Sequence, residues 1–88
     1  MFRLWAKIFK DTRMLQDTVI EISKEDTRTH KVFQALEKAC LEFNLSQPIW
    51  LDLNIRDFQQ FNKTRFTQDS FMEEILFDYL EIHVIEED

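Results

Sequence analysis

The 88-residue chain contains no glycine, although average usage of about 7% would give about six. Phosphate-cradling loops, dinucleotide-binding fingerprints and the nucleophile elbow of serine hydrolases all need glycine. Each of these sites requires a positive φ angle or a close approach to the backbone. The sequence therefore excludes all three kinds of site.

Length and aromatic content predict a single domain spanning residues 1–88. Domains mostly run to about 100–150 residues, so a second domain has no room. Nine Phe, two Trp and one Tyr provide the packing, because each buried aromatic ring removes about 150–250 Å² from water. We therefore expect a core that needs neither a disulfide nor a metal.

Two segments near the N-terminus alternate with the period of two that is typical of half-buried strands. The core side of residues 2–9 consists of Phe2, Leu4, Ala6 and Ile8. The other side consists of Arg3, Trp5, Lys7 and Phe9. A polar break at residues 10–13 and a second alternating run at residues 18–23 predict that the chain opens with a β-hairpin.

A helix is predicted for residues 27–43. Asp26 stands at the position of an N-cap, and Asn44 is suited to end the helix where no glycine is available. Six residues recur at helical spacing and form one core face. They are Val32, Phe33, Leu36, Ala39, Cys40 and Phe43.

The segment that follows this helix gives shorter signals. Pro48 restricts the residue before it to extended geometry, which predicts a short buried connection at residues 49–51. Asn54 and Asp57 resemble a capping pair, and the apolar spacing after them predicts a short helix at residues 55–61.

The last part of the chain predicts two more strands. Phe66 lies in a Thr-rich run that suits a strand, and Ser70 begins an S-x-x-E capping-box pattern, which favours another helical turn. The alternation returns at Tyr79 and predicts a final strand. Its core side is Leu80, Ile82 and Val84, and its other side is Tyr79, Glu81 and His83. The order β-β-α-(α)-β-β predicts an α+β domain, with a largely antiparallel sheet and the helix of residues 27–43 on one face.

Charge is distributed unevenly along the chain. Residues 1–44 carry eight Lys/Arg and seven Asp/Glu, a net of +1, whereas residues 45–88 carry three and ten, a net of −7. Opposite charges on neighbouring strands attract, so Arg3 and Lys7 predict that the first strand lies beside the acidic last strand. The chain has no Lys or Arg from residue 73 onward, where its acidic residues are Glu73, Glu74, Asp78, Glu81, Glu86, Glu87 and Asp88.

The side chains that most often carry catalysis or bind metals are scattered. Cys40 is the only cysteine, which excludes an internal disulfide, and its place on the core face predicts an inert thiol. His30 is about 15 Å from Cys40 along the helix, and His83 alternates outward, so we expect both histidines on the surface. We expect no metal, no cofactor and no enzymatic activity.

The side of the first strand that carries Trp5 and Phe9 alternates cations with rings, as in proteins that bind single-stranded nucleic acid. The net charge of −6 opposes phosphate binding, so we do not expect direct binding of nucleic acid. We favour the interpretation that the two rings pack beneath the short helix, which carries Phe58 and Phe61. The alternative is that they stay uncovered and form a contact patch for a protein.

The acidic final strand also has two interpretations. In the first, its charges keep a sheet edge from pairing with other chains and keep the protein in solution. In the second, they bind a basic partner, as in an inhibitor that mimics nucleic acid. The candidate interaction residues are Arg3, Trp5, Lys7, Phe9, Tyr79, Glu81, His83, Glu86 and Glu87.

The opening F-R-L-W-A-K-I-F-K-D and the closing T-R-F-T-Q-D and D-Y-L-E-I-H-V-I-E-E-D resemble segments of short proteins of anaerobic Gram-positive bacteria. The resemblance covers nearly the whole chain, implies a bacterial cytosolic origin and carries no catalytic residue across. The start of the chain lacks the apolar run of a signal peptide, and no stretch approaches the roughly 18 apolar residues of a membrane span. We therefore expect a cytoplasmic protein that does not contact membranes.

Our leading hypothesis is a small acidic non-enzymatic protein-interaction module, which binds a protein partner or forms a homodimer through a sheet edge. An acidic inhibitor or nucleic-acid mimic that binds a basic partner is the second hypothesis. A small enzyme is the third.

Overall fold

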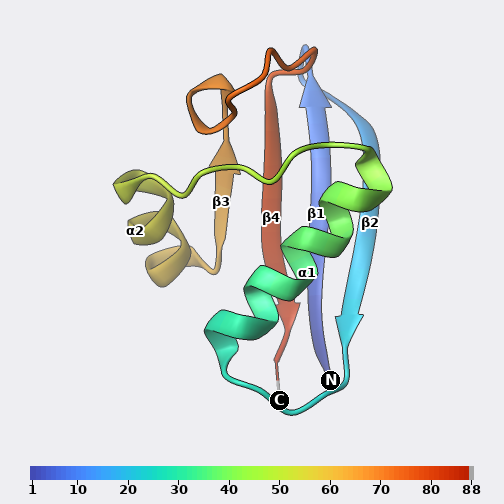
Figure 1. The fold of residues 1–88 in the computed structure, drawn as a ribbon, viewed down its shortest axis with the longest axis vertical. Helices are drawn as coiled ribbons and strands as arrows, with labels where there is room; N and C mark the ends of the chain where they lie inside the picture. The colour runs from blue at the N-terminus through green and yellow to red at the C-terminus, as the bar shows by residue number, and fades with distance from the viewer. Residues whose placement is uncertain (88) are drawn as a thin grey trace.

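The computed structural model describes residues 1–87, which form a four-stranded antiparallel sheet and two helices. The strand order is β2-β1-β4-β3, so the first and last strands are the two central ones (Figure 1). The strands are β1 (Phe2–Lys10), β2 (Arg13–Ile22), β3 (Lys63–Phe66) and β4 (Tyr79–Glu86). The helices are α1 (Arg28–Phe43) and α2 (Asp52–Phe61), and Gln68–Ser70 form a 3-10 turn.

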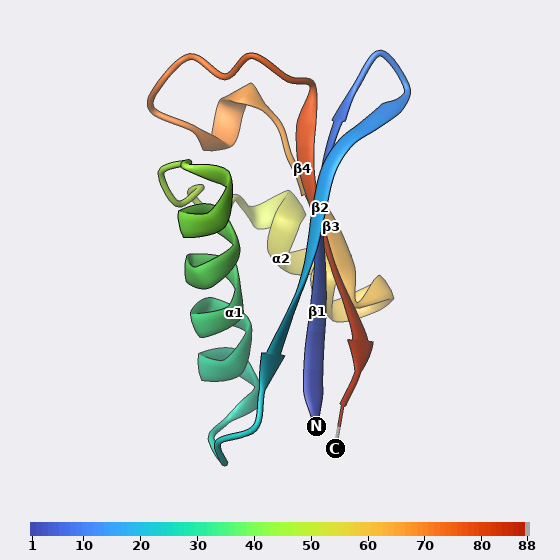
Figure 2. The ribbon, with the colours of Figure 1, turned by 90° about the vertical axis from the view of Figure 1, so that its right-hand side faces the viewer.

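The predicted α+β order is therefore confirmed, and so is the pairing of the first strand with the last. α1 crosses one face of the sheet over β1 and β2, while α2 lies beside β3 (Figures 1 and 2). Neither helix within residues 1–87 is long and apolar enough to cross a membrane. The core between α1 and the sheet contains Phe2, Leu4, Ala6, Ile8, Val32, Leu36, Phe66, Leu80 and Ile82, among others.

Within residues 1–87, four residues adopt the left-handed backbone conformation that glycine usually supplies. Asp11 and Thr12 form the tight turn between β1 and β2 with φ angles of 52° and 65°. Asn44 and Asn62 end α1 and α2 with φ angles of 57° and 58°. Asn and Asp tolerate this region because their short polar side chains bond to the local backbone, whereas β-branched Thr does not. Asn44 thus ends the helix as predicted.

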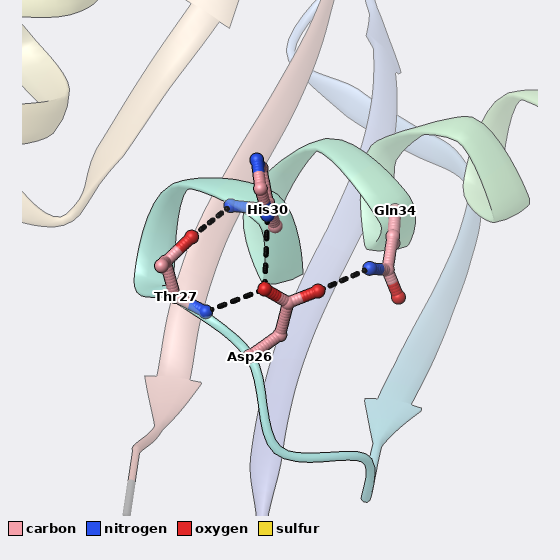
Figure 3. Close-up of polar contacts among 4 residues, drawn as sticks. All are labelled: Asp26, Thr27, His30 and Gln34. Atoms are coloured by element: carbon pink, nitrogen blue, oxygen red, sulfur yellow. Dashed lines mark hydrogen bonds and ion pairs between the residues drawn. The ribbon is translucent and has the colours of Figure 1, made fainter.

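The N-cap of α1 is Thr27, so the prediction of Asp26 at that position is wrong by one residue. The Thr27 hydroxyl accepts a hydrogen bond from the His30 backbone, as an N-cap does. Asp26 accepts bonds from the Thr27 N–H, from Gln34 and from His30, whose Nδ1 lies 2.9 Å away (Figure 3). The bond to His30 and that from Thr27 hold the pKa of the Asp26 carboxyl below its ordinary value.

The connection at residues 49–51 is not buried as predicted, because Ile49 and Leu51 are exposed and only Trp50 is half-buried. The Trp50 ring stands edge-on to Phe58 and Phe66, at centroid distances of 5.5 and 5.0 Å. It also contacts Phe33, which is 47% exposed and therefore lies at the rim of the core rather than within it.

The second helix and the turn after β3 also begin differently from the prediction. α2 starts at Asp52, and Asn54 caps it from inside, because its side chain accepts a hydrogen bond from the Leu51 backbone. Asn54 then donates to Thr64 and to the Arg65 carbonyl, which ties α2 to β3. The 3-10 turn ends at residue 70, so the helical turn predicted after it is absent from the described residues.

The turn without glycine generates a prediction about stability. Replacing Thr12 with glycine should raise the free energy of unfolding by about 0.5–1 kcal/mol. Placing a non-glycine residue in the left-handed region destabilises the folded state by roughly 1–2 kcal/mol, and glycine removes this strain. Glycine also gives the unfolded chain more conformational freedom, which offsets part of the gain in stability. Urea denaturation of the Thr12→Gly variant measures the change.

Thr67→Gly is the matched control. Thr67 is also exposed, but its φ angle of −92° is ordinary. The same substitution should therefore lower stability there by about 0.5–1 kcal/mol. Equal effects at both positions would show that the left-handed turn carries no strain.

Candidate interaction surface

The face of the sheet that turns away from α1, here called the outer face, is organised in rows that cross the strands. One row has alternating charge across all four strands, because Asp17 pairs with Lys7, Lys7 with Glu81, and Glu81 with Arg65. We call it the ionic row. The row on one side of it is Met14, Phe9 and Tyr79. The row on the other side is Val19, Trp5, His83 and Lys63.

The centre of the ionic row is a buried ion pair. The Lys7 Nζ lies 2.8 Å from Glu81 Oε2, and Arg65 Nε lies 3.1 Å from Glu81 Oε1. Lys7 is 9% exposed and Glu81 is 7% exposed. Rings shield the charges, since Lys7 Nζ is 3.9 Å from the Trp5 ring centroid and Arg65 stacks over Tyr79. Lys7 and Glu81 are therefore structural residues of this face and not exposed contact residues as predicted.

Two opposing effects set the pKa of the Glu81 carboxyl. Burial alone would raise that pKa, because it disfavours the charged form. The hydrogen bonds and positive charges of Lys7 and Arg65 outweigh burial and bring the pKa below its ordinary value. Glu81 is therefore ionised at neutral pH, and the pair is maintained.

The aromatic rings of the outer face are half-buried and are not covered by α2. Phe9 stacks on Tyr79 with 5.2 Å between centroids, and Trp5 donates from Nε1 to Asp17. α2 packs against β3, and its Phe58 joins the core on the side of α1. The interpretation that the short helix covers Trp5 and Phe9 is therefore wrong. Within residues 1–87 no helix covers these two rings.

The two histidines differ in their surroundings. His30 is exposed as predicted and pairs with Asp26. His83 is half-buried rather than fully exposed, because it lies in the row between Trp5 and Lys63. Burial, followed by the charges of Lys7 and Lys63, lowers the pKa of His83 below its ordinary value. His83 is therefore neutral at pH 7.

The acidic residues of the last segment do not form one strip. Glu81 is the buried partner of Lys7, Glu86 lies 3.4 Å from Arg3 Nε, and Glu87 lies 2.7 Å from the Nε of Arg28. Glu73, Glu74 and Asp78 precede β4 and lie at the other end of the sheet (Figure 1). Asp88 lies outside the described residues. Three of the predicted acidic contact residues are therefore already paired with cations.

The charges that remain exposed on the outer face have opposite signs at its two edges. Lys63 and Arg65 lie on the β3 edge, and Asp17 and Glu21 lie on the β2 edge. Two of these four have an exposed side chain that also pairs within the chain, since Glu21 lies 3.5 Å from Arg3 and Arg65 lies 3.1 Å from Glu81. The ion pair between these edges is neutral overall. The outer face therefore has a positive edge, a neutral aromatic centre and a negative edge.

Sequence reasoning missed the hollows on the other side of the molecule. A groove of about 310 Å³ runs between α1 and α2, with Phe33, Trp50 and Ile55 among its lining residues. A cleft of about 350 Å³ lies at the hairpin end of the sheet. The high exposure of several large apolar residues marks these regions, but exposure cannot be read from residue spacing.

Side chains suited to metal binding or nucleophilic chemistry do not gather within residues 1–87. No group of three His, Cys, Asp or Glu in this part of the chain could hold a metal ion. Burial raises the pKa of the Cys40 thiol to about 11, which keeps it in its unreactive form at neutral pH. Cys40 is thus part of the core, as predicted.

Comparison of the chain with family models, curated proteins and solved structures found no match. The resemblance to short proteins of anaerobic Gram-positive bacteria stays a prediction.

The buried ion pair generates a prediction about the dependence of stability on pH. Glu81→Gln should lower the free energy of unfolding at pH 7 by about 1–3 kcal/mol, because it leaves the buried Lys7 ammonium without its counter-ion. The folded pKa of Glu81 is depressed, so its contribution is present above the unfolded value of about 4.3 and is lost as pH falls through the folded pKa. Urea denaturation between pH 7 and pH 3 should show the two proteins converging.

Glu86→Gln is the control. It removes a carboxylate from the same strand, but its pair with Arg3 is exposed and should contribute less than about 1 kcal/mol. Equal losses in the two variants at pH 7, or a gap for Glu81→Gln that does not narrow as the pH falls, would contradict the role given to the ion pair.

Proposed function

We propose that this protein is a small non-enzymatic protein-interaction module that binds through the outer face of its sheet. The observation that carries the proposal is the state of the charges at the centre of that face. Lys7 and Glu81 are already paired and shielded from water. A partner can therefore cover the centre without leaving a buried charge unpaired, which is the most expensive failure of an interface.

The composition of the outer face supports the same function. Interfaces are enriched in Trp, Tyr, Phe, Met and Arg, and the outer face presents Trp5, Phe9, Tyr79 and Met14 around the ionic row. These side chains are half-buried or exposed and lie on strands, so their positions are fixed before binding. Little conformational entropy is lost when such a surface is covered.

A second copy of the chain is the partner that fits the charge pattern. Consider a two-fold axis that runs parallel to the strands between two sheets packed face to face. It places the β3 edge of each copy, with Lys63 and Arg65, against the β2 edge of the other, with Asp17 and Glu21. The aromatic centres then meet each other. Opposite charges at the rim of the dimer fix this orientation.

Pairing through the sheet edge is less favourable than pairing through the face. The edge strands are β2 and β3, and α2 packs against β3, so β2 is the edge open to another strand. Antiparallel pairing of β2 with its copy would bring the acidic Asp17 and Glu21 of both chains to one seam. Like charges on neighbouring strands are destabilising. Face-to-face packing removes this conflict.

The other hypotheses have less support from the described residues. An acidic inhibitor would need free carboxylates along the last strand, but Glu81, Glu86 and Glu87 have cationic partners. An enzyme would need His83 in a cleft with a carboxylate, and His83 lies on the open face of the sheet instead. We keep the bacterial cytoplasm as the proposed location.

A charge-swap experiment tests the proposed dimer. The variants Lys63→Glu and Glu21→Lys should each be monomeric at concentrations where the wild type is dimeric, because each creates two like-charge contacts across the interface. An equimolar mixture of the two variants should form a heterodimer, since the contacts regain opposite charges. Analytical ultracentrifugation of the three samples measures the masses.

A heterodimer in the mixture would show that both variants are folded, so that their failure to dimerise alone is caused by charge. Monomeric mutants that fail to pair on mixing would contradict the orientation, and a wild type that is monomeric at 100 μM would contradict self-association. The control is Lys38→Glu, an exposed charge reversal on α1, which should leave the dimer unchanged.

A further inference from the structure

A cleft opens at the hairpin end of the sheet, where three segments that are distant in sequence meet. These are the end of the β1–β2 hairpin, the C-terminal end of α1 and the segment at residues 71–78, which leads into β4 (Figure 2). Its volume is about 350 Å³, which suits a large side chain or a short peptide segment. Its apolar lining includes Ile8, Leu15, Phe43, Leu45, Ile75 and Leu76.

The segment at residues 71–78 is held in place by the side chain of Gln68. The Gln68 amide donates to the Glu73 carbonyl at 2.7 Å and accepts from the Ile75 N–H at 2.9 Å. Phe71 is buried at one end of the segment, and Phe77 packs edge-on against it. This wall of the cleft is therefore shaped before any partner arrives.

The same segment exposes large apolar side chains that the fold does not need. Met72 is 94% exposed and Leu76 is 80% exposed, although the neighbouring Ile75 is packed against the core. Leu15 on the opposite wall is also exposed. The backbone of this segment is fixed, so these apolar side chains stay exposed to water beside the cleft. Exposed apolar side chains that cluster in this way mark a contact surface.

The rim of the cleft is negative. Glu73 and Glu74 line it, and no Lys or Arg among the described residues does. Phe43, the last residue of α1, also lines the cleft, and the last turn of that helix contains Glu42 but no basic residue. The carbonyl end of a helix carries a partial negative charge, and a basic residue in that turn would usually offset it. A cation supplied by a partner would be stabilised chiefly by the carboxylates of Glu73 and Glu74, which line the cleft.

From these features we infer that the cleft binds a protein segment with a large apolar side chain flanked by Lys or Arg. The apolar side chain fills the space between Leu15 and Leu76, and the flanking cations contact Glu73 and Glu74. The groove between α1 and α2 carries no such inference. Its rim charge, Arg28, is already bonded to Glu87 and Asn62.

Fluorescence anisotropy with three labelled synthetic peptides tests the inference. The first combines Leu with Lys, the second replaces Leu with Ser, and the third replaces Lys with Glu. Only the Leu/Lys peptide should bind, and its affinity should fall as salt rises. The measurement is made on the wild type and on Lys63→Glu, so that loss of the proposed dimer and loss of cleft binding are distinguishable.

Variants locate the binding site. Leu76→Ser should weaken binding of the Leu/Lys peptide about tenfold, as expected for the loss of one buried Leu. The double variant Glu73→Gln/Glu74→Gln should weaken it by a similar factor at low salt. The matched control is Glu37→Gln/Asp52→Asn, which removes two exposed charges away from the cleft and should leave the affinity within twofold.

Three outcomes would show that the cleft does not bind such a segment, and a fourth would place the segment elsewhere. They are no binding of the Leu/Lys peptide at millimolar concentration, equal binding of the Leu/Lys and Ser/Lys peptides, and equal loss in the cleft and control double variants. Binding that is unaffected by Leu76→Ser and is lost on Phe33→Ser would place the peptide in the groove between α1 and α2 instead. In that case the assignment to the cleft fails.

Discussion

The pairing of β1 with β4 is the interaction on which the rest of the structure depends. It joins the two ends of the chain at the centre of the sheet, with β2 and β3 each attached to only one of these strands. Without it, the β1–β2 and β3–β4 pairs would be separate two-stranded ribbons, which are marginally stable in water. The buried pair of Lys7 and Glu81 lies within this ladder, and the backbone N–H of Asp78 extends it by donating to the Phe9 carbonyl.

The elements that could be predicted from sequence are those whose signal is local and repeats. β1, β4 and α1 each show an uninterrupted period, and Asn44 ends α1 because few other residues adopt a left-handed backbone. Predictions failed where two neighbouring residues had equal chemistry, as with Asp26 and Thr27, or where tertiary contacts decided the outcome. Trp50 is drawn to Phe58 and Phe66, and its neighbours in sequence remain in water. No local pattern contains that information.

Sequence alone predicts which residues lie on the outer face, but not how deeply each of them is buried. Alternation alone places Arg3, Trp5, Lys7 and Phe9 on one side, and the charges of the last segment identify the neighbouring strand. The burial of Lys7, however, depends on the Trp5 ring beside it, and its partner Glu81 is also paired with Arg65, which comes from β3. The cleft could not be predicted at all, because its walls come from three segments that only the folded chain brings together.

The two proposed surfaces are compatible because they lie on opposite sides of the sheet. The cleft is on the side of α1, so packing of two outer faces leaves it open. The proposed two-fold axis runs parallel to the strands, and therefore both hairpin ends point the same way. Such a dimer presents two negative apolar clefts at one end. A partner with two cationic apolar segments would bind the second cleft at high effective concentration, provided that its linker spans the distance between them.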